Sequence, residues 1–383
     1  MTARPIDPDN RRRPVSAAVA LVLLLAMVMA AGCMGRDYVP DNDIIVIKIS
    51  SDSSLAWSQI IDNGGDDKAS ILIPTSDGGV VVPVNYFRLL RLSTNGKTLW
   101  ERGFVDSGCM VDSLIQLRDG SFITGSSATG VICKIDTDGN LVWNRTIKSN
   151  ESGVISPYSV IETAGGVMLV AGNYIAQLDE DGRSTWQRSY ITAGHRIFSV
   201  IEMKKNGDLL GLSQNDDQLF LLKMDRNGTI TANSSLDKYN EDSLSHLYSI
   251  KNGYSMFFFN TTNSTMETME IDSDGKITQK KAVINAAPSP WVLLQNPNIM
   301  TDDDGYASVI VRYPDSQTNI PAGRRKISLG VKKMDASGAE EWTSTPMTYC
   351  KPENTINIQI KGIVQTSDGG YVILGLRDNF WKC

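Results

Sequence analysis

The sequence predicts an all-β fold assembled from repeated four-stranded units, and three observations lead to this expectation. First, a ten-residue motif that usually ends in tryptophan recurs along the chain at nearly constant intervals. Second, a short glycine-containing turn falls between successive copies of that motif. Third, the segments that flank these turns are short, apolar and rich in β-branched residues, which is typical of strands rather than helices.

The tryptophan motif is clearest at residues 134–143, which read Lys-Ile-Asp-Thr-Asp-Gly-Asn-Leu-Val-Trp. Seven copies align on their last residue, and the first four of these positions are each 43 residues apart: Trp57, Trp100, Trp143, Trp186, Ala232, Gln279 and Trp342. Repeats of about this length are typical of architectures in which one supersecondary unit is stacked many times. The regular spacing therefore indicates a single repeated fold rather than two or three unrelated domains.

The second signature has Asp-Gly, Asn-Gly or Gly-Gly in the turn. Its seven copies stand at residues 75–79, 118–120, 164–166, 205–207, 251–253, 303–305 and 366–370. Glycine supplies the positive φ that tight hairpin turns require. Each repeat thus contains two hairpins, or four strands in roughly 43 residues, which is the blade of a β-propeller. Seven copies predict seven blades in one closed domain.

The ends of the repeat region predict how the ring closes. The chain opens on one type of hairpin at residues 44–61 and closes on the other type at residues 360–376. The first hairpin can therefore complete the last blade, which leaves no exposed sheet edge. The long interval before Trp342 predicts insertions near residues 286–298 and 313–325, as loops that leave the disc.

Residues 1–32 have the pattern of an export signal. Three arginines at residues 11–13 precede an apolar run from Val15 to Ala31, and Cys33 follows Ala-Ala-Gly. A basic head, a short apolar stretch and small residues before a cleavage site are typical of a secretory signal peptide. The end of this segment resembles a lipobox, which implies lipidation of Cys33 after cleavage. An uncleaved membrane anchor and simple secretion remain as alternatives, and all three place the rest of the chain outside the cytoplasm.

The predicted organisation is a signal peptide at 1–32, a tether at 33–42, a seven-bladed propeller at 43–377 and a C-terminal tail at 378–383. Without residues 1–32 the chain keeps 33 basic and 41 acidic side chains, a net charge of −8. This balance excludes nucleic acid as an expected partner, because phosphate binding requires clustered Lys and Arg. Attachment to a membrane would then depend on the N-terminal lipid or anchor.

The repeats resemble those of extracytoplasmic β-propeller lipoproteins that are common in methanogenic archaea. Residues 134–143 and 366–375 carry the closest likeness, and the resemblance covers roughly residues 43–377. Residues 94–100 are also similar, more distantly, to the blades of quinoprotein dehydrogenases. Those blades usually have one more residue between Asp and Gly, so the likeness implies a fold and a location and brings no cofactor.

Two motifs suggest ligands, but a structural interpretation is favoured for each. Asp-x-Asp-Gly at residues 136–139 and 272–275 looks like the start of a calcium loop, yet the further oxygen ligands are missing and the next strand follows at once. These aspartates are expected to accept hydrogen bonds from turn amides. The periodic tryptophans are expected to pack between blades rather than to form a sugar-stacking surface. Replacement by Ala232 and Gln279 predicts thinner packing or a local pocket there.

No catalytic, metal-binding or cofactor-binding residue is predicted. Four cysteines remain besides Cys33, and they allow three disulfide connectivities: Cys109, Cys133, Cys350 and Cys383. Proximity in the sequence favours pairing the first with the second and the third with the fourth, and four free thiols are the alternative. His195 and His246 are expected to be surface or loop residues. Six glycosylation sequons, which chance also explains, begin at Asn144, Asn150, Asn227, Asn233, Asn260 and Asn263.

The leading hypothesis is a membrane-anchored propeller lipoprotein at the cell surface that serves as a binding or scaffolding module for protein or glycan. The alternative is an extracytoplasmic propeller enzyme, either a glycan hydrolase or lyase or a quinoprotein-like oxidoreductase. Converging carboxylates or cations with strongly shifted pKa values at the central channel would favour the enzyme. A third hypothesis is a structural component of the cell envelope with no small ligand.

Overall fold

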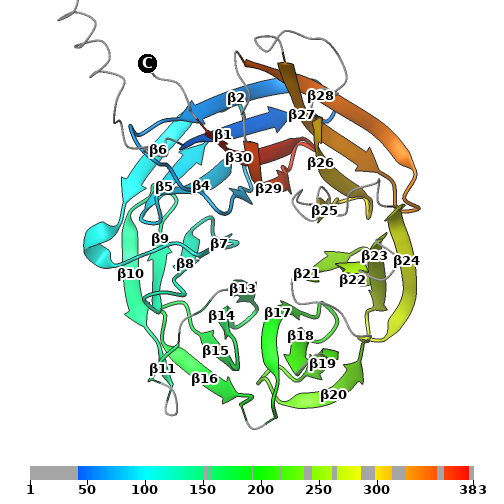
Figure 1. Cartoon of the computed structure of the whole chain (residues 1–383). Coiled ribbons are helices and arrows are strands. Elements are labelled where there is room, and N and C mark those ends of the chain that lie inside the picture. Colours follow the sequence, from blue (N-terminus) through cyan, green and yellow to red (C-terminus); the bar gives the residue numbers. More distant parts are fainter. Residues whose placement is uncertain are drawn as a thin grey trace, which may run out of the picture. The chain divides into compact units, whose positions relative to one another are not determined.

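The computed structural model describes residues 42–149, 153–155, 157, 159–191, 193–215, 218–236, 244–260, 265–285, 298–312, 325–351 and 358–378. Within these ranges the chain forms 30 β-strands and a single 3-10 turn, η1 (Val105–Ser107). Apart from one two-stranded ribbon, the strands form seven sheets of four strands each. The sheets are arranged as the blades of a β-propeller (Figure 1), which confirms the predicted fold class.

Blades 1 to 3 come from consecutive antiparallel strands. Blade 1 is β3 (Ile73–Pro74), β4 (Val80–Val84), β5 (Arg88–Leu92) and β6 (Thr98–Gly103); blade 2 is β7 (Ser113–Gln116), β8 (Phe122–Gly125), β9 (Val131–Ile135) and β10 (Leu141–Thr146); blade 3 is β13 (Ser159–Thr163), β14 (Gly166–Ala171), β15 (Tyr174–Leu178) and β16 (Ser184–Ser189). The two-stranded ribbon, β11 (Lys148–Ser149) and β12 (Gly153–Val154), lies between blades 2 and 3 in the sequence.

Blades 4 to 6 continue the same strand order. Blade 4 is β17 (Arg196–Glu202), β18 (Leu209–Asn215), β19 (Gln218–Met224) and β20 (Ile230–Ser235); blade 5 is β21 (Leu244–Ile250), β22 (Gly253–Asn260), β23 (Thr265–Asp272) and β24 (Ile277–Asn285); blade 6 is β25 (Asn298–Met300), β26 (Tyr306–Arg312), β27 (Arg325–Met334) and β28 (Glu340–Lys351). The first strand of each blade lies toward the centre of the ring and the fourth lies at the rim (Figure 1).

Blade 7 combines both ends of the repeat region. Its strands are β29 (Ile358–Gln365), β30 (Tyr371–Asp378), β1 (Asn42–Ile49) and β2 (Leu55–Ile61). Strand β1 pairs with β30 along its whole length, so that the first hairpin completes the last blade as predicted. Closure in this way removes the two open sheet edges that the ends of the ring would otherwise present.

The core between blades consists of apolar side chains that point alternately to the two faces of each strand. In β1, Ile44 and Val46 pack in one cluster with residues of blade 1 such as Val80, while Ile45 belongs to a second cluster with residues of blade 6 such as Val331. Successive side chains of a strand point to opposite faces of its sheet. A strand buried on both faces therefore needs a continuous apolar run, which explains the Ile-Ile-Val-Ile sequence of β1.

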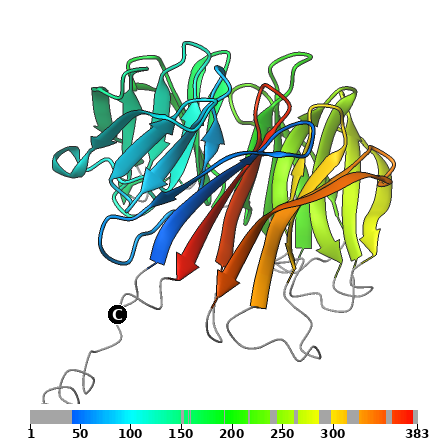
Figure 2. The ribbon, with the colours of Figure 1, turned by 90° about the horizontal axis from the view of Figure 1, so that it is seen from above.

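The ring has two distinct faces, which the side view in Figure 2 separates. Because each blade is antiparallel, the turns from its first to second and from its third to fourth strands lie on one face, the turn face. Loops from second to third strands and links between blades lie on the other, the connection face. Asn42 of β1 pairs with Asp378 of β30, so the described chain begins and ends on the connection face.

The predicted insertions and termini lie outside the described residues. These are residues 286–297 between β24 and β25, residues 313–324 between β26 and β27, and the N-terminal segment before Asn42 with its signal, Cys33 and most of the tether. Nearly all of the predicted tail at 378–383 lies outside the described residues as well.

Candidate functional site: a hollow between two blades

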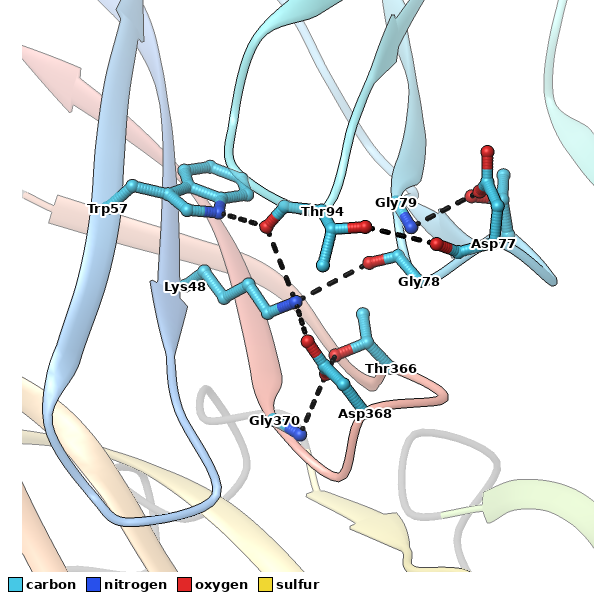
Figure 3. A network of polar contacts seen from close by, with 10 residues as sticks. Lys48, Trp57, Asp77, Gly78, Gly79, Thr94, Thr366, Asp368 and Gly370 are labelled. Atoms are coloured by element: carbon cyan, nitrogen blue, oxygen red, sulfur yellow. Dashed lines mark hydrogen bonds and ion pairs between the residues drawn. The ribbon is translucent and has the colours of Figure 1, made fainter.

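A repeated polar contact fastens neighbouring blades together on the turn face. Figure 3 shows it between blades 7 and 1, where the buried Lys48 ammonium lies 2.5 Å from the Asp368 carboxylate of its own blade. The same ammonium lies 3.4 Å from the Gly78 carbonyl oxygen and 3.5 Å from the Thr94 carbonyl oxygen of blade 1. Trp57, the cross-strand neighbour of Lys48, donates its indole N–H to the Thr94 carbonyl at 2.8 Å. We call this set the interblade latch.

The next interface repeats the latch with different residues. Arg91 pairs with Asp77 of its own blade at 2.7 Å and donates at 2.7 Å to the Thr137 carbonyl of blade 2. Trp100 donates its indole N–H to that same carbonyl at 2.9 Å. A long basic side chain and a tryptophan thus meet one backbone oxygen of the following blade.

The third interface keeps the tryptophan half of the latch. Trp143 donates its indole N–H to the Glu180 carbonyl of blade 3 at 3.1 Å. Lys134, its cross-strand neighbour, pairs with Asp119 within blade 2 at 3.2 Å. The predicted packing role of the periodic tryptophans is therefore confirmed at three successive interfaces.

Glycine in the receiving turn permits this close packing. Gly96 has φ of 79°, and a Cβ atom placed on it would lie 2.7 Å from the Trp57 ring. Gly139 has φ of 85°, and a Cβ atom there would lie 2.9 Å from the Trp100 ring. A side chain at either position would strain the backbone and collide with the indole.

Hydrogen bonds keep the latch aspartates ionised. Burial alone would raise the pKa of Asp368, but hydrogen bonds from Lys48, from Thr366 and from the Gly370 amide outweigh it and hold the pKa below its usual value. Burial is likewise outweighed at Asp77, whose pKa is lowered by Thr75, the Gly79 amide and Arg91. The carboxylates therefore stay charged and able to neutralise the buried cations.

The latch is interrupted between blades 3 and 4. At the position of Lys48, Arg91 and Lys134 stands Gln177, which accepts from the Thr163 hydroxyl at 3.1 Å and donates to its neighbour's carbonyl within blade 3. The shorter turn of blade 3 lacks the aspartate that blades 1, 2, 6 and 7 supply as Asp77, Asp119, Asp303 and Asp368. Within the described part of the chain, Gln177 has no hydrogen bond to blade 4.

Trp186 is also released from its usual partner. The corresponding carbonyl of blade 4 is that of Arg226, two residues before Gly228. Among the described residues, the Trp186 indole N–H donates no hydrogen bond, although its ring still packs within 2.9 Å of a Cβ position on Gly228. The turn of blade 4 is held instead by Tyr190, whose hydroxyl donates to the Gly228 carbonyl at 2.5 Å.

A cavity of about 590 Å³ opens where the latch is interrupted. We call it the hollow; it is lined by Thr163, Ala164, Gly165, Met168, Gln177, Thr185, Trp186, Glu202, Asn206, Gly207, Leu209, Arg226 and Asn227. Ligand cavities usually have volumes of about 300–1,000 Å³ and combine apolar walls with a few placed polar groups. The size and lining of the hollow fit that description.

A second cavity of about 460 Å³ continues the hollow toward the inner strands. Ala164, Glu202 and Gly207 line both cavities. Arg118, Glu162 and Lys204 contribute further charge to the inner one. The two cavities together form a groove on the turn face that runs from the rim strand β16 to the inner strands β13 and β17.

Glu202 and Arg226 bring opposite charges to the hollow. Both approach Gly207, where a Cβ atom would lie 3.6 Å from Glu202 Oε1 and 4.0 Å from Arg226 Nη2. Glu202 accepts from the Ala164 amide with both carboxylate oxygens, at 3.2 and 3.0 Å. Arg226 donates to the Asn206 carbonyl at 2.9 Å. In the described structure these two side chains make no ion pair with each other, so both keep capacity for a ligand.

The hollow is not where the sequence located a gap in the packing. Thinner packing or a local pocket was expected beside Ala232 and Gln279, and the hollow lies one interface before Ala232. At the Ala232 interface, Lys223 donates to the Asp274 carbonyl of blade 5 at 3.1 Å, and Lys205 pairs with the Asp274 carboxylate at 2.5 Å. A signal was present in the repeats: the residues opposite the first four tryptophans are Lys, Arg, Lys and then Gln.

The predicted disulfide between Cys109 and Cys133 is confirmed. It joins the link after η1 to β9, and both cysteines are fully buried. Cys350 belongs to β28, but Cys383 lies outside the described residues. Their pairing stays a prediction, as does lipidation of Cys33.

The turn role of the calcium-like motifs is confirmed. Asp136 accepts hydrogen bonds from the Asn140 amide at 2.7 Å and from the Asp138 amide at 2.9 Å, and these bonds lower its pKa. Asp272 accepts equivalent bonds from Asp274 and Lys276, both at 2.9 Å. In each turn, two backbone amides therefore share Oδ1 of the first aspartate.

The expectation that both histidines lie at the surface or in loops is confirmed for His195 as a loop residue, but its side chain is buried. His195 lies in the loop before β17, but it is only 6% exposed and packs edge-on against Phe220. Its Nδ1 is 3.1 Å from the Ser213 hydroxyl, and burial lowers its pKa. Ser213 is fully buried, so this pair fills the core instead of facing a substrate. His246 belongs to β21, and its side chain is not among those that the structure describes.

Three carboxylates that the sequence did not single out meet on the connection face. Asp43, Asp62 and Asp67 place oxygen atoms within 4.8 Å of one another. Arg377 donates to Asp43 at 2.8 Å, and Asn63 donates to Asp67 at 2.9 and 3.0 Å. These contacts give the cluster a structural role in fixing the link between β2 and β3.

For three of the predicted sequons, the structure describes the asparagine side chain and shows that it is exposed. Asn144 lies on β10, Asn227 lies in the turn beside the hollow, and Asn233 lies on β20. The side chains of Asn150, Asn260 and Asn263 lie outside the described set. Glycosylation at all six stays a prediction. Across the described ranges, no helix has the length and apolar character needed to cross a membrane.

Part of the chain matches a known protein family. The family model described as "Outer membrane protein assembly factor BamB" matches residues 86–242, which include the hollow. This supports the expected likeness to quinoprotein-like propellers. A search of curated proteins found no match.

Several solved structures have a similar arrangement. A streptogramin B lyase is 14% identical and covers 87% of this chain and 98% of its own, with a TM-score of 0.52. BamB from Moraxella catarrhalis is 14% identical and covers 86% of this chain and 91% of its own, with a TM-score of 0.44. A catalytically inactive virginiamycin B lyase from Staphylococcus aureus, with quinupristin, is 12% identical and covers 87% and 99%, with a TM-score of 0.48. At these identities the likeness concerns the fold alone.

Proposed function

We propose that this chain is an extracytoplasmic, membrane-tethered propeller that acts as a binding or scaffolding module for a protein or a glycan. The observation that carries the proposal is the hollow on the turn face. It occurs where the interblade latch is interrupted, and rigid strands and turns hold its lining residues in place. A cavity supported by a closed ring of sheets is preorganised, which lowers the entropic cost of binding.

Two observations support the location outside the cytoplasm. A buried disulfide joins Cys109 and Cys133, and such bonds persist mainly in oxidising compartments. The family model that matches residues 86–242 describes an outer membrane protein assembly factor. The export signal at residues 1–32 agrees with both.

The length of the tether limits the distance between a lipid and the propeller. Asn42 is nine positions after Cys33 in the sequence, so an extended tether spans at most about 30 Å. Asn42 enters the propeller on the connection face. A lipid on Cys33 would therefore keep Asn42 within about 30 Å of the membrane.

Three turn-face carboxylates at the interblade contacts are unsuited to act as general acids. Hydrogen bonds hold the pKa values of Asp77, Asp119 and Asp368 below their usual value. A general acid in a glycan hydrolase requires the opposite, a carboxyl group whose pKa is raised by its surroundings.

Capture by cell-envelope material tests the proposal. Detergent-solubilised full chain is compared with the variant Gln177→Lys, which places a latch-like lysine in the hollow. We expect envelope preparations to capture the wild-type chain and to lose at least about tenfold of that affinity with the variant. Protease treatment of the envelope then identifies a protein ligand, and periodate oxidation identifies a glycan. Equal capture of both chains would contradict binding through the hollow.

The tether is tested separately. Mass spectrometry of the N-terminal peptide is expected to find Cys33 as the lipidated first residue, and Cys33→Ala is expected to move the chain out of the membrane fraction. An N-terminal peptide that retains residues 1–32 would contradict lipidation and support the uncleaved anchor.

A further inference from the structure

We infer that the hollow binds a neutral sugar unit of a glycan, with Trp186, Glu202 and Arg226 as its contact residues. The inference deepens the proposed function and rests on it. It depends on three properties of the described residues. The indole N–H of Trp186 makes no interblade hydrogen bond, and Glu202 and Arg226 form no ion pair with each other. The groove also extends beyond the space that one sugar unit would fill.

Trp186 offers a glycan both an apolar ring face and a hydrogen-bond donor. Its ring is partly exposed in the wall of the hollow, and its indole N–H donates no hydrogen bond to described residues. The apolar C–H face of a pyranose packs on an aromatic ring, and the in-plane indole N–H can donate to a hydroxyl group of an adjoining sugar unit. Trp143, one blade earlier, cannot take this role because its N–H is bound to the Glu180 carbonyl.

Glu202 and Arg226 supply the complementary acceptor and donor. The carboxylate accepts from ligand hydroxyls, and the guanidinium donates to hydroxyl or ring oxygens. The Ala164 amide already fixes the position of Glu202, so little side-chain freedom is lost on binding. A hydroxyl both donates and accepts, and it is therefore the ligand group that satisfies this pair of side chains best.

The charge of the hollow disfavours other ligand classes. Glu202 and Arg226 are its only charged lining side chains among the described residues, so their charges cancel. An anion such as phosphate would require clustered cations, and a basic peptide would require clustered carboxylates. The adjoining 460 Å³ cavity leaves room for further sugar units, and its lining adds Lys204 and the paired Arg118 and Glu162.

Titration calorimetry with defined probes tests the inference on the detergent-solubilised full chain. The probes are chitotriose, maltotriose, cellotriose, inorganic phosphate and trilysine. We expect saturable binding of at least one neutral trisaccharide and none of phosphate or trilysine. Trp186→Ala and Glu202→Gln should each weaken that binding at least about tenfold, because each removes one placed contact.

Trp143→Phe is the matched control, since it removes an indole N–H that serves only an interblade contact. It should leave trisaccharide affinity within about twofold of the wild type. Three results would each overturn the inference. They are equal weakening of trisaccharide binding by the Trp143 and Trp186 variants, no binding of any trisaccharide, and preferential binding of phosphate or trilysine. The proposed function fails separately, when envelope material captures the wild-type chain and the Gln177→Lys variant equally.

Discussion

The residue opposite the periodic tryptophan differs between the hollow and the two interfaces that a basic side chain bridges. Lys48 and Arg91 are long enough to join a turn aspartate of their own blade to carbonyl groups of the next blade. Gln177 occupies the same position, but its shorter, neutral side chain is satisfied within its own blade. Loss of the charge and of the turn aspartate happen together at this interface. That pairing is physically reasonable, because a buried lysine without a carboxylate would be costly.

The two tryptophans on either side of this change should differ in their contribution to stability. Trp143→Phe removes a hydrogen bond to Glu180, whereas Trp186→Phe removes an N–H that has no described partner. We expect the first variant to lose about 1 kcal/mol more free energy of unfolding than the second. Urea unfolding of both variants measures the difference, and equal losses would mean that Trp186 is latched like its counterparts.

The interblade latch between blades 7 and 1 should weaken at acidic pH, because Asp368 becomes protonated. Its pKa is lowered in the folded chain, so its stabilising effect is complete above its ordinary pKa of about 3.8 and is lost as the pH falls through the lower folded value. Asp368→Asn should cost about 1–2 kcal/mol at pH 7, after allowance for solvent screening, and progressively less toward pH 3.

Asp52→Asn is the matched control for that substitution. Asp52 accepts hydrogen bonds from Ser54 in an exposed turn and has no ion pair in the described structure. At pH 7, Asp52→Asn should lower the urea midpoint less than Asp368→Asn does. A loss at Asp368 that does not change between pH 7 and pH 3 would contradict the ionic role of the latch.

At the scale of single elements, the disulfide ties a surface link to a blade. Cys109 follows η1, Cys133 lies in β9, and 24 positions separate them. Cross-linking a segment of this length restricts the unfolded chain by about 3 kcal/mol. The double variant Cys109→Ala, Cys133→Ala should lower the free energy of unfolding by about that amount. Guanidinium unfolding measures it, and an unchanged midpoint would show that the bond is absent or contributes nothing.

The elements were more predictable than the site they build. Hairpin turns are local, so Asp-Gly and Asn-Gly between apolar runs located both turns of nearly every repeat and hence all seven blades. The hollow is not local, because it requires Gln177, Trp186 and Arg226 from different strands and two blades. The burial of His195 was not predicted for a similar reason: it depends on β18 and β19, which pack against its loop.

At the scale of the whole propeller, stability depends on closing the ring. Strand β1 supplies the partner of β30 and apolar residues for two interblade clusters. Removal of residues 1–61 should expose the edge of β30 and produce aggregation or a non-cooperative unfolding transition. A chain that lacks only residues 1–41 is the control and should unfold cooperatively, as followed by circular dichroism and light scattering. Cooperative unfolding of the shorter chain would contradict closure by the first hairpin.

The position of a bound ligand would show whether the interrupted latch creates a ligand site on the turn face. A crystal structure of the chain grown with its best-binding trisaccharide tests this most directly. We predict ligand density in the hollow, with a sugar ring against Trp186 and hydroxyl groups within hydrogen-bond distance of Glu202 and Arg226. Ligand density confined to the connection face, with the hollow closed by Gln177, would contradict the account.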